Sequence, residues 1–262
     1  MQKLILSIFK KLKSPLQTSH KGQNGILYIV AGSKQYHGSL WYAIEIASRL
    51  VDLIYVETDL SNYALVRALK KLHPAIILVS PAERKTYLAK SDCVLLGPGL
   101  GRSERTKKLV CNILASRYCP VKRVIDADAL YYLTKSLYTE QTVITPHAGE
   151  YQALFGEQNP VLISQMLPSV IVAKGHKTVI CQNGKSCYNS IGNAGLTKGG
   201  TGDVLAGLIA ALGCTHSVWL ASRLAVVAEG CAAETLAKRY ATRFSTTQLI
   251  EQIPKTFHHY SQ

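Results

Sequence analysis

The sequence predicts an α/β fold with a mostly parallel central sheet and helices on both of its faces. Short runs rich in Val, Ile and Leu recur over the first 150 residues, and longer segments with helical spacing of apolar residues separate them. A strand in a parallel sheet is covered on both sides, so it is apolar along its whole length. Repeated strand-helix units of this kind build three layers, helix on sheet on helix.

Each apolar run is interpreted as one strand and each longer segment as one helix. The predicted strands are 26–31, 53–57, 75–79, 92–96, 121–125 and 141–144, and the predicted helices among them are 39–50, 61–72 and 103–117. After residue 170 the runs 171–175 and 178–182 are strand-like, and Asn183-Gly184 is a strong hairpin signal before a returning strand at 185–189. Helical spacing then covers 203–213, 216–240 and 245–252, so the sheet is followed by a C-terminal hairpin and helices.

Composition favours one domain that binds a small anion. The chain has 262 residues, of which 47% are hydrophobic, and 30 Lys and Arg against 16 Asp and Glu give a net charge of +14. These basic residues are scattered, apart from a weak cluster at Lys10, Lys11 and Lys13, so we expect a small polyanionic ligand and no nucleic acid partner. The seven cysteines include no Cys-x-x-Cys pair and follow no secretory leader, which predicts reduced thiols and a cytoplasmic protein.

The N-terminal segment has an amphipathic pattern. Residues 1–13 place five apolar side chains on one helical face with lysines elsewhere: Leu4, Ile5, Ile8, Phe9 and Leu12. Such a helix can lie on a membrane surface, but docking onto its own domain is the favoured interpretation, and the segment is too short to span a bilayer. We therefore expect a helical extension over 1–19, a single domain over 20–262 and no membrane partner.

Two loops that follow predicted strands are rich in glycine or acidic residues. In open α/β sheets ligands bind beyond the carboxyl ends of the strands, so these loops are expected to converge at one edge. Three glycines within Gly97–Gly101 leave amide N–H groups free for phosphate oxygens, although a simple turn is the alternative. Asp126 and Asp128 are candidates to touch magnesium or a ligand hydroxyl, and Asp128 also suits the N-cap of a helix beginning near Ala129.

The loop 145–150 holds a histidine and a glutamate. His147 lies between Pro and Gly residues, which favours a ligand contact over a place in the core. Glu150 is either a first-turn residue that complements a helix dipole or an outer group that holds hydrated magnesium through water. Neither interpretation of Glu150 excludes the other.

The segment 193–212 carries the strongest signal. Gly199, Gly200, Thr201 and Gly202 precede Asp203 and an apolar helix. Small residues at a helix N-terminus leave amide groups free to hold phosphoryl oxygens, and Asp203 stands where a general base can accept the proton of an attacking hydroxyl. A simple helix cap explains Asp203 but not the small residues before it.

Six blocks of the chain resemble the ribokinase-like superfamily and, within it, the NAD(P)H-hydrate dehydratases. They occur in the family's order and run from the first predicted strand into the apolar helix: AGSKQYHGS (31–39), GPGLG (97–101), DADAL (126–130), TPHAGE (145–150), KGHKT (174–178) and KGGTGDVLAGLI (198–209). The resemblance implies a ribokinase-like three-layer fold. It also implies cofactor repair, in which hydrated NADH or NADPH (NADHX, NADPHX) is phosphorylated on its ring hydroxyl and then loses phosphate to give back the reduced cofactor.

The resemblance also implies roles for particular residues. ADP or ATP, with Mg²⁺, would contact Lys174, Gly175, His176, Lys177, Thr178, Gly200, Thr201 and Gly202. The hydrated substrate would contact Ser39, Gly99, Gly101, His147 and Asp203, with Asp203 as the catalytic base. The chain departs from the family at Ser39, where Ala is usual, at Ala194, where Pro is common, and at Leu196-Thr197, where Met-Ala is common; these changes bear on fine substrate preference.

The family context implies partners and alternatives. Many bacterial relatives carry an N-terminal epimerase domain, and with about 20 residues before His20 we expect the epimerase to be a separate protein. Relatives commonly form tetramers or larger rings, so a homo-oligomer is expected. The alternatives are a ribokinase-like kinase of a small alcohol such as hydroxyethylthiazole and, ranked lower, a basic nucleic-acid-binding protein on a degenerate kinase fold.

Overall fold

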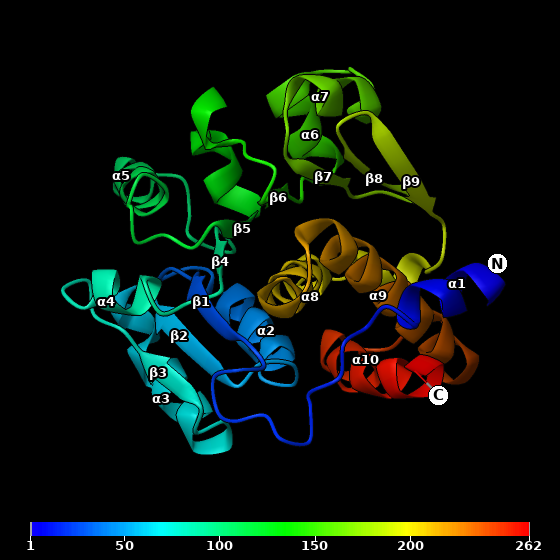
Figure 1. Cartoon of the computed structure of the whole chain (residues 1–262), viewed down its shortest axis with the longest axis horizontal. Helices are drawn as coiled ribbons and strands as arrows, with labels where there is room; N and C mark the ends of the chain where they lie inside the picture. Colours follow the sequence, from blue (N-terminus) through cyan, green and yellow to red (C-terminus); the bar gives the residue numbers. More distant parts are fainter. Residues whose placement is uncertain (1, 262) are drawn as a thin grey trace.

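One nine-stranded sheet runs through residues 2–261, the part of the chain that this computed structural model describes, with side chains from residue 5 onward (Figure 1). The strand order is β3-β2-β1-β4-β5-β6-β7-β8-β9. The strands are β1 (Ile26–Val30), β2 (Leu53–Glu57), β3 (Ile76–Leu78), β4 (Cys93–Leu96), β5 (Lys122–Ile125), β6 (Thr142–Ile144), β7 (Val170–Ala173), β8 (Thr178–Gln182) and β9 (Lys185–Asn189). β1 to β7 pair in parallel, whereas β8 pairs antiparallel with β7 and with β9.

Helices cover both faces of this sheet. They are α1 (Gln2–Phe9), α2 (His37–Ala47), α3 (Tyr63–Leu72), α4 (Arg84–Leu88), α5 (Glu104–Leu114), α6 (Ala148–Phe155), α7 (Pro160–Met166), α8 (Thr201–Thr215), α9 (Val218–Tyr240) and α10 (Thr246–Ser261). Successive side chains of a strand point to opposite faces. Leu27 and Ile29 accordingly pack with α2, α3 and α8 to α10, and Tyr28 and Val30 pack with α4 to α7. The predicted three-layer α/β fold is confirmed.

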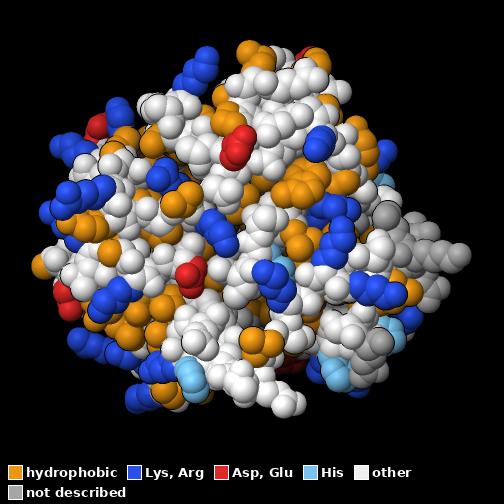
Figure 2. Space-filling view, in the orientation of Figure 1, with side chains coloured by type: hydrophobic (Ala, Val, Ile, Leu, Met, Phe, Trp, Pro, Cys, Tyr) orange, Lys and Arg blue, Asp and Glu red, His pale blue; other side chains and the backbone are white. Residues whose placement is uncertain are grey.

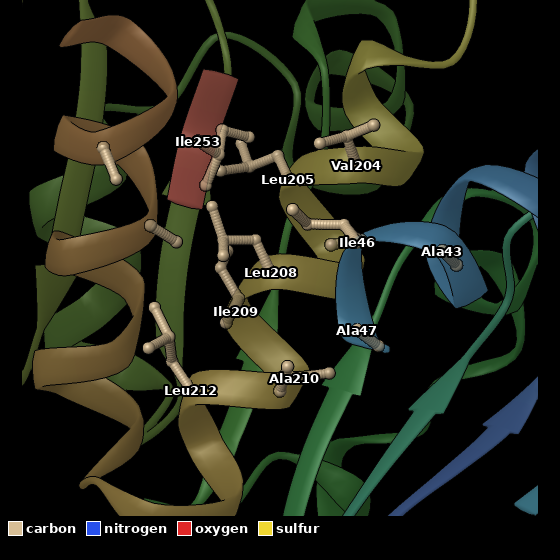
Figure 3. Close-up of a cluster of buried hydrophobic side chains, with 14 of the residues drawn as sticks. Ala43, Ile46, Ala47, Val204, Leu205, Leu208, Ile209, Ala210, Leu212 and Ile253 are labelled. Atoms are coloured by element: carbon tan, nitrogen blue, oxygen red, sulfur yellow. The ribbon is translucent and has the colours of Figure 1, made fainter. Parts of the chain in front are cut away.

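The helix α8 is the centre of the first layer. Leu205, Leu208 and Ile209 are buried there against α2 and α10, as the cluster in Figure 3 shows. Gly207 allows the close approach of α2, since a Cβ at this position would lie 2.8 Å from the side chain of Ile46. The apolar packing of α8 on all sides therefore fixes the position of its N-terminus, where Gly200 to Asp203 lie.

The N-terminal helix α1 docks on the same layer, as the sequence favoured. The Phe9 ring stacks on Tyr260 with centroids 4.9 Å apart and meets Phe257 edge-on at 5.8 Å. Ile5 and Ile8 are also buried in this cluster, while the side chain of Leu4 lies outside the described part. These contacts give the apolar face of α1 a partner within its own chain. The domain boundary at residue 20 stays a prediction.

All nine predicted strands are confirmed to within two residues at each end. The short helices α4 and α7 were not predicted, because one or two turns show no clear period, and α6 was foreseen only as a helix start in the first-turn interpretation of Glu150. The predicted end of the last helix at residue 252 is wrong, since α10 continues to Ser261 with Pro254 inside it. The expected cap at Asp128 is also wrong: a 3-10 helix spans Ala127–Tyr132 and encloses this residue.

The surface carries its positive charge in scattered form. Figure 2 shows Lys and Arg side chains spread over one face among neutral and apolar groups. The seven cysteines are all free thiols. Within residues 2–261, no helix has the combination of length and apolar character that crossing a membrane requires.

Candidate active site

The carboxyl ends of the parallel strands converge at one edge of the sheet. The loop after β4 meets the loop after β1, because the N–H of Gly32 donates to the carbonyl of Pro98 at 2.8 Å. The loops after β6 and β7 meet likewise, with the N–H of Lys174 donating to the carbonyl of Pro146 at 2.9 Å. The first turn of α8 reaches the same edge, since a Cβ at Gly202 would lie 3.4 Å from Nζ of Lys174.

The first turn of α8 is built for close approach. Gly200 has a φ of +93°, and a Cβ there would lie 2.1 Å from the ring of Tyr42. The Thr201 hydroxyl donates to two carbonyls of the preceding loop, at 2.7 and 2.9 Å. The first N–H groups of an α-helix have no acceptor within the helix, so those of Gly202 and Asp203 are available to an anion at the positive end of the helix dipole.

Asp203 has the properties of a general base. Burial, the largest influence, together with repulsion from Asp126 and Glu150, raises the pKa of its carboxyl to about 7, although a hydrogen bond from Ser39 and the charge of Lys174 oppose the rise. A base whose pKa lies near neutral pH is ionised often enough to accept a proton and basic enough to hold it. The structure thus brings Ser39 and Asp203 together, as the resemblance implied.

Lys174 is the cation at the centre of the site. Its Nζ lies 2.9 Å from Oδ1 of Asp126, and its side chain is 19% exposed. Burial, the largest single influence, lowers the pKa of Lys174, but attraction by Asp126, Glu150 and Asp203 outweighs it, so the pKa is raised overall. Lys174 therefore remains protonated and offsets the charge of these carboxylates.

Asp126 is a buried partner of Lys174. Its side chain is 3% exposed, and Oδ1 also accepts a hydrogen bond of 2.6 Å from the hydroxyl of Thr145. With these two donors the carboxylate is already engaged. Its structural role here is to hold Lys174 in place, and a direct contact with magnesium or a ligand hydroxyl stays a prediction.

His147 and Glu150 form a capping box at the start of α6. Nδ1 of His147 accepts the N–H of Gly149 at 3.0 Å, and Oε2 of Glu150 accepts the N–H of His147 at 2.8 Å. This confirms Glu150 as a first-turn residue. Burial raises the pKa of its carboxyl, against the hydrogen bond from the His147 backbone. Its second expected role, to hold hydrated magnesium through water, stays a prediction.

The glycine-rich loop after β4 shapes the site sterically. Gly99 has a φ of +63°, and a Cβ there would lie 2.9 Å from Cβ of Ser39. The expectation of a cradle of free amides is wrong for most of this loop. The N–H groups of Gly97 and Leu100 donate to backbone carbonyls at 3.1 and 3.2 Å, and that of Gly101 donates to the Asp128 carboxylate at 2.8 Å. Asp128 thus anchors this loop.

A cavity of about 670 Å³ opens beside the first turn of α8. Six of the eight residues expected to contact the nucleotide line it, namely Lys174, Gly175, His176, Thr178, Thr201 and Gly202, together with His147. Gly200 does not line it but packs against Tyr42. Lys177 lies elsewhere, with its Nζ 4.6 Å from the centre of the Tyr188 ring.

The cavity also contains polar residues that sequence reasoning missed. Asn193 and Glu229 line it, and each has a buried polar atom without a hydrogen-bond partner. A signal for Glu229 existed, because it is an isolated acidic residue within the long apolar stretch of α9. Asn193 follows a glycine and caps a short 3-10 helix. Because capping alone accounts for an Asn at this position, there was no sequence signal of a further role.

A second cavity, of about 440 Å³, lies beyond the ends of β1 and β2. Its lining holds three basic side chains, Lys34, Arg84 and Arg105, and two acidic ones, of which Asp59 pairs with Arg105 at 3.2 Å. Glu57, at the end of β2, is paired with Arg84 and accepts the hydroxyl of Tyr28 at 2.8 Å. Within residues 2–261, no group of three or more His, Cys, Asp or Glu side chains is arranged to hold a metal ion.

The fold and the site first define a class. The crystal structure of a ribokinase-like superfamily protein from Enterococcus faecalis superposes with a TM-score of 0.87 at 26% identity, covering 98% of this chain and 95% of that one. The ribokinase-like fold is therefore confirmed. The family follows from a second comparison: the chain belongs to the NAD(P)H-hydrate dehydratase family, whose model matches residues 27–255.

Relatives of known name agree with this family. The chain is 34% identical over 258 residues to the bifunctional NAD(P)H-hydrate repair enzyme Nnr of Methanocaldococcus jannaschii. This match covers 94% of this chain and 50% of the relative. It is 31% identical over 261 residues to the ADP-dependent (S)-NAD(P)H-hydrate dehydratase of Lactiplantibacillus plantarum, covering 93% of this chain and 92% of that one. The chain thus spans about half the length of the bifunctional relatives that it matches.

Proposed function

We propose that this protein restores NADH and NADPH from their S-hydrates in a nucleotide-dependent dehydration. The observation that carries the proposal is Asp203, a carboxyl with a pKa of about 7 on the anion-binding first turn of α8. Family membership supports the substrate, and the name of the L. plantarum relative supports ADP as the nucleotide. ATP is the alternative nucleotide.

The chemistry follows from the arrangement of these groups. Asp203 accepts the proton of the ring hydroxyl while the hydroxyl oxygen bonds to the terminal phosphorus, and the bond from that phosphorus to the rest of the nucleotide breaks. The N–H groups at the start of α8 and the ammonium of Lys174 stabilise the charge on the transferring group. Phosphate then leaves with the electrons of the bond between its oxygen and the ring carbon. Loss of a proton from the ring restores the double bond. The products are reduced cofactor, phosphate and AMP from ADP, or ADP from ATP.

The nucleotide is assigned to the cavity of about 670 Å³, with its phosphates at Gly202 and Lys174. Magnesium bound to those phosphates would supply further positive charge. The acidic groups fit a hydrated ion rather than a directly bound one, because Asp126 and Glu150 already accept hydrogen bonds from protein donors. Glu150 is the residue that would hold such an ion through water.

The hydrated ring is assigned to the sheet edge beside Ser39, Gly99 and Asp203, with His147 at its border. The remainder of the dinucleotide is assigned to the second cavity, whose three basic side chains outnumber its two acidic ones and leave a small positive excess that suits a pyrophosphate. This assignment predicts one binding region for ADP or ATP and a separate one for the hydrated dinucleotide.

The biological setting belongs to the same proposal. We expect the protein to act in the cytoplasm, beside a separate epimerase that interconverts the hydrate epimers, and to form a tetramer or larger homo-oligomer. The absence of nucleic acid and membrane partners stays a prediction.

A product assay tests the function. Purified protein, ADP or ATP, and Mg²⁺ are incubated with the S-hydrate of NADH, and the absorbance of reduced nicotinamide is followed. We expect its return only when nucleotide is present. A stable phosphorylated alcohol made from another substrate, with no NADH regenerated, would instead establish the small-molecule kinase.

A further inference from the structure

The peptide between Gly199 and Gly200 is held by a side chain from a distant helix. The hydroxyl of Thr246 donates to the carbonyl of Gly199 at 2.9 Å, although 47 residues separate the two in the chain. Thr246 is the first residue of α10, and it is only 5% exposed. It lines neither the nucleotide cavity nor the second cavity, so its contact with the site is made through the backbone.

This hydrogen bond changes what the Gly199 carbonyl does. In an α-helix the carbonyl of one residue accepts the N–H of the residue four positions later, which for Gly199 is Asp203. That bond is not formed, and the first such bond of α8 joins the N–H of Val204 to the carbonyl of Gly200 at 2.9 Å. Within residues 2–261, the N–H groups of Gly200, Gly202 and Asp203 have no acceptor. The hydroxyl therefore engages a carbonyl that would otherwise compete with an anion for the N–H of Asp203.

The same contact sets the direction of a second N–H group. The peptide bond is planar and trans, so the carbonyl of Gly199 and the N–H of Gly200 point in opposite directions. Because the carbonyl points at Thr246, the N–H of Gly200 points away from α10. Together with the free N–H groups of Gly202 and Asp203, it makes three donors at the positive end of α8.

The loop before α10 also holds the residues that lead into this turn. Nζ of Lys198 donates to the carbonyl of Thr242 and lies 5.0 Å from the centre of the Phe244 ring. Phe244 is fully buried, and a Cβ at Gly195 would lie 2.2 Å from its ring. The segment that leads into α8 therefore contacts this part of the chain at three points, and Thr246 provides the one nearest the helix.

The position of Thr246 is fixed by the start of α10. The N–H of Ser245 donates to Oε1 of Gln248 at 2.7 Å, and the N–H of Gln248 donates to Oγ of Ser245 at 3.1 Å. Such a capping box fixes the residue at which a helix begins. Leu249 and Ile250, in the next turn, are buried in the core. The hydroxyl of Thr246 is therefore held in place before any ligand binds.

We propose that Thr246 is a positioning residue for the first turn of α8. Its hydroxyl keeps the Gly199 carbonyl away from this turn, so that the N–H groups of Gly200, Gly202 and Asp203 stay free for the transferring phosphoryl group. The inference rests on the proposed function and adds a residue that serves it without touching nucleotide or substrate. Loss of the hydroxyl lets the Gly199 carbonyl turn to the N–H of Asp203, which takes donors away from the developing charge.

Two substitutions of Thr246 and one of its neighbour test the proposal. Thr246→Val removes the hydroxyl and keeps the shape of the side chain, Thr246→Ser keeps the hydroxyl, and Thr247→Val changes the exposed residue beside it. The kcat for NADH regeneration should fall by about 10-fold or more in Thr246→Val, because loss of a direct donor costs about 100-fold and this loss is indirect. It should stay within about 3-fold of the wild type in Thr246→Ser and Thr247→Val.

Nucleotide binding separates a positioning role from a merely structural one. Calorimetry gives the dissociation constants of ADP and AMP, which differ by the terminal phosphate expected at the turn; if turnover requires ATP, the pair compared is ATP and ADP. The wild type should bind the longer nucleotide about 10-fold tighter than the shorter one. Thr246→Val should bind the two within about 3-fold of each other, with the affinity for the shorter one unchanged. General damage to the cavity would instead weaken both equally.

Thermal melting reports folding, and the assays are run below the lowest melting temperature among the variants. If Thr246→Val does not fold, Thr246→Ala replaces it, because Ala and Ser differ only in the hydroxyl. A folded variant without the hydroxyl that keeps the wild-type kcat, or that loses affinity for both nucleotides equally, overturns the inference alone. Failure of the wild type to bind ADP or ATP, or to regenerate NADH, overturns the proposed function as well.

Discussion

Nζ of Lys174 lies 2.9 Å from Oδ1 of Asp126, although 48 residues separate the two in the chain. This pair joins the end of β7 to the end of β5, and the same ammonium approaches the first turn of α8 at Gly202. One lysine therefore links the acidic groups of the sheet edge to the N-terminus of α8. Its positive charge offsets part of the negative charge of Asp126, Glu150 and Asp203.

Replacing Lys174 by Met should abolish most activity and shift its pH dependence. Without the ammonium, the pKa of Asp203 rises further, because one of the two influences that oppose its rise is lost. We expect kcat/KM to fall by about 100-fold or more, as for loss of a group that stabilises transferring charge, and the alkaline rise in activity to move to higher pH. Rates measured from pH 5 to 9 check both.

The matched control for Lys174 is Lys177→Met. Lys177 is exposed and lies over the Tyr188 ring, outside the nucleotide cavity. Its loss should change kcat/KM by less than about 3-fold, the size of a weak surface interaction. Equal damage by the two substitutions would contradict the central place given to Lys174.

Asp203→Asn should stabilise the protein above neutral pH. The folded pKa of about 7 is higher than the 3.8 of an unperturbed Asp, so the folded state keeps a proton that the unfolded chain has lost. Wild-type stability should therefore fall as pH rises from about 4 to about 7, by at most about 4 kcal/mol at about 1.4 kcal/mol per pKa unit. Asn has no such penalty. Denaturant unfolding at pH 5 and pH 8 measures the difference, and a variant that gains nothing on going to pH 8 would refute the raised pKa.

Gly200→Ala should damage the site through the backbone. A side chain at a φ of +93° is strained, and its Cβ would lie 2.1 Å from the Tyr42 ring. We expect a loss of stability of about 2 kcal/mol or more and a matching loss of turnover. Gly199→Ala is the control, because a Cβ there meets nothing within 4 Å. Melting curves and rates of both variants decide whether the turn at Gly200 is required.

The double variant Lys34→Ala, Arg105→Ala should weaken binding of the hydrated dinucleotide. Both side chains line the second cavity. Neither of them is among the residues that line the nucleotide cavity. KM for the hydrate should rise by about 10-fold while kcat and the affinity for ADP stay unchanged, as for loss of uniform binding. Steady-state kinetics and ADP calorimetry on the same variant test this prediction. A fall in ADP affinity with an unchanged KM for the hydrate would show that this cavity binds ADP and that its assignment to the hydrated dinucleotide is wrong.

The sequence predicted the strands and the start of α8 well, because both are local signals. Apolar runs such as 26–31 mark buried strands, and Gly200 to Asp203 mark a helix start whatever surrounds them. Short helices such as α4, spanning Arg84–Leu88, were not predicted, because a single helical turn has no measurable period. Pro254 suggests an end to α10, yet packing of Ile253 and Phe257 on the core carries the helix past it.

The site was predicted less completely than the fold, since its electrostatics depend on tertiary contacts. Asp126 was recognised as a candidate, but nothing local shows that Lys174 would neutralise it. Asp128 appeared to be a cap and instead anchors Gly101. Glu229 became visible only when α9 was placed against the loop at Ile191. Distances between remote segments are what the sequence alone withholds.

Phosphate release per molecule of NADH regenerated tests the central claim most directly. With the S-hydrate, ADP and Mg²⁺, the wild type should release one phosphate for each NADH formed, and Asp203→Asn should form neither while binding ADP within about 3-fold of the wild type, since the base and binding roles are separable. NADH regenerated without phosphate release, or by Asp203→Asn at the wild-type rate, would contradict the account.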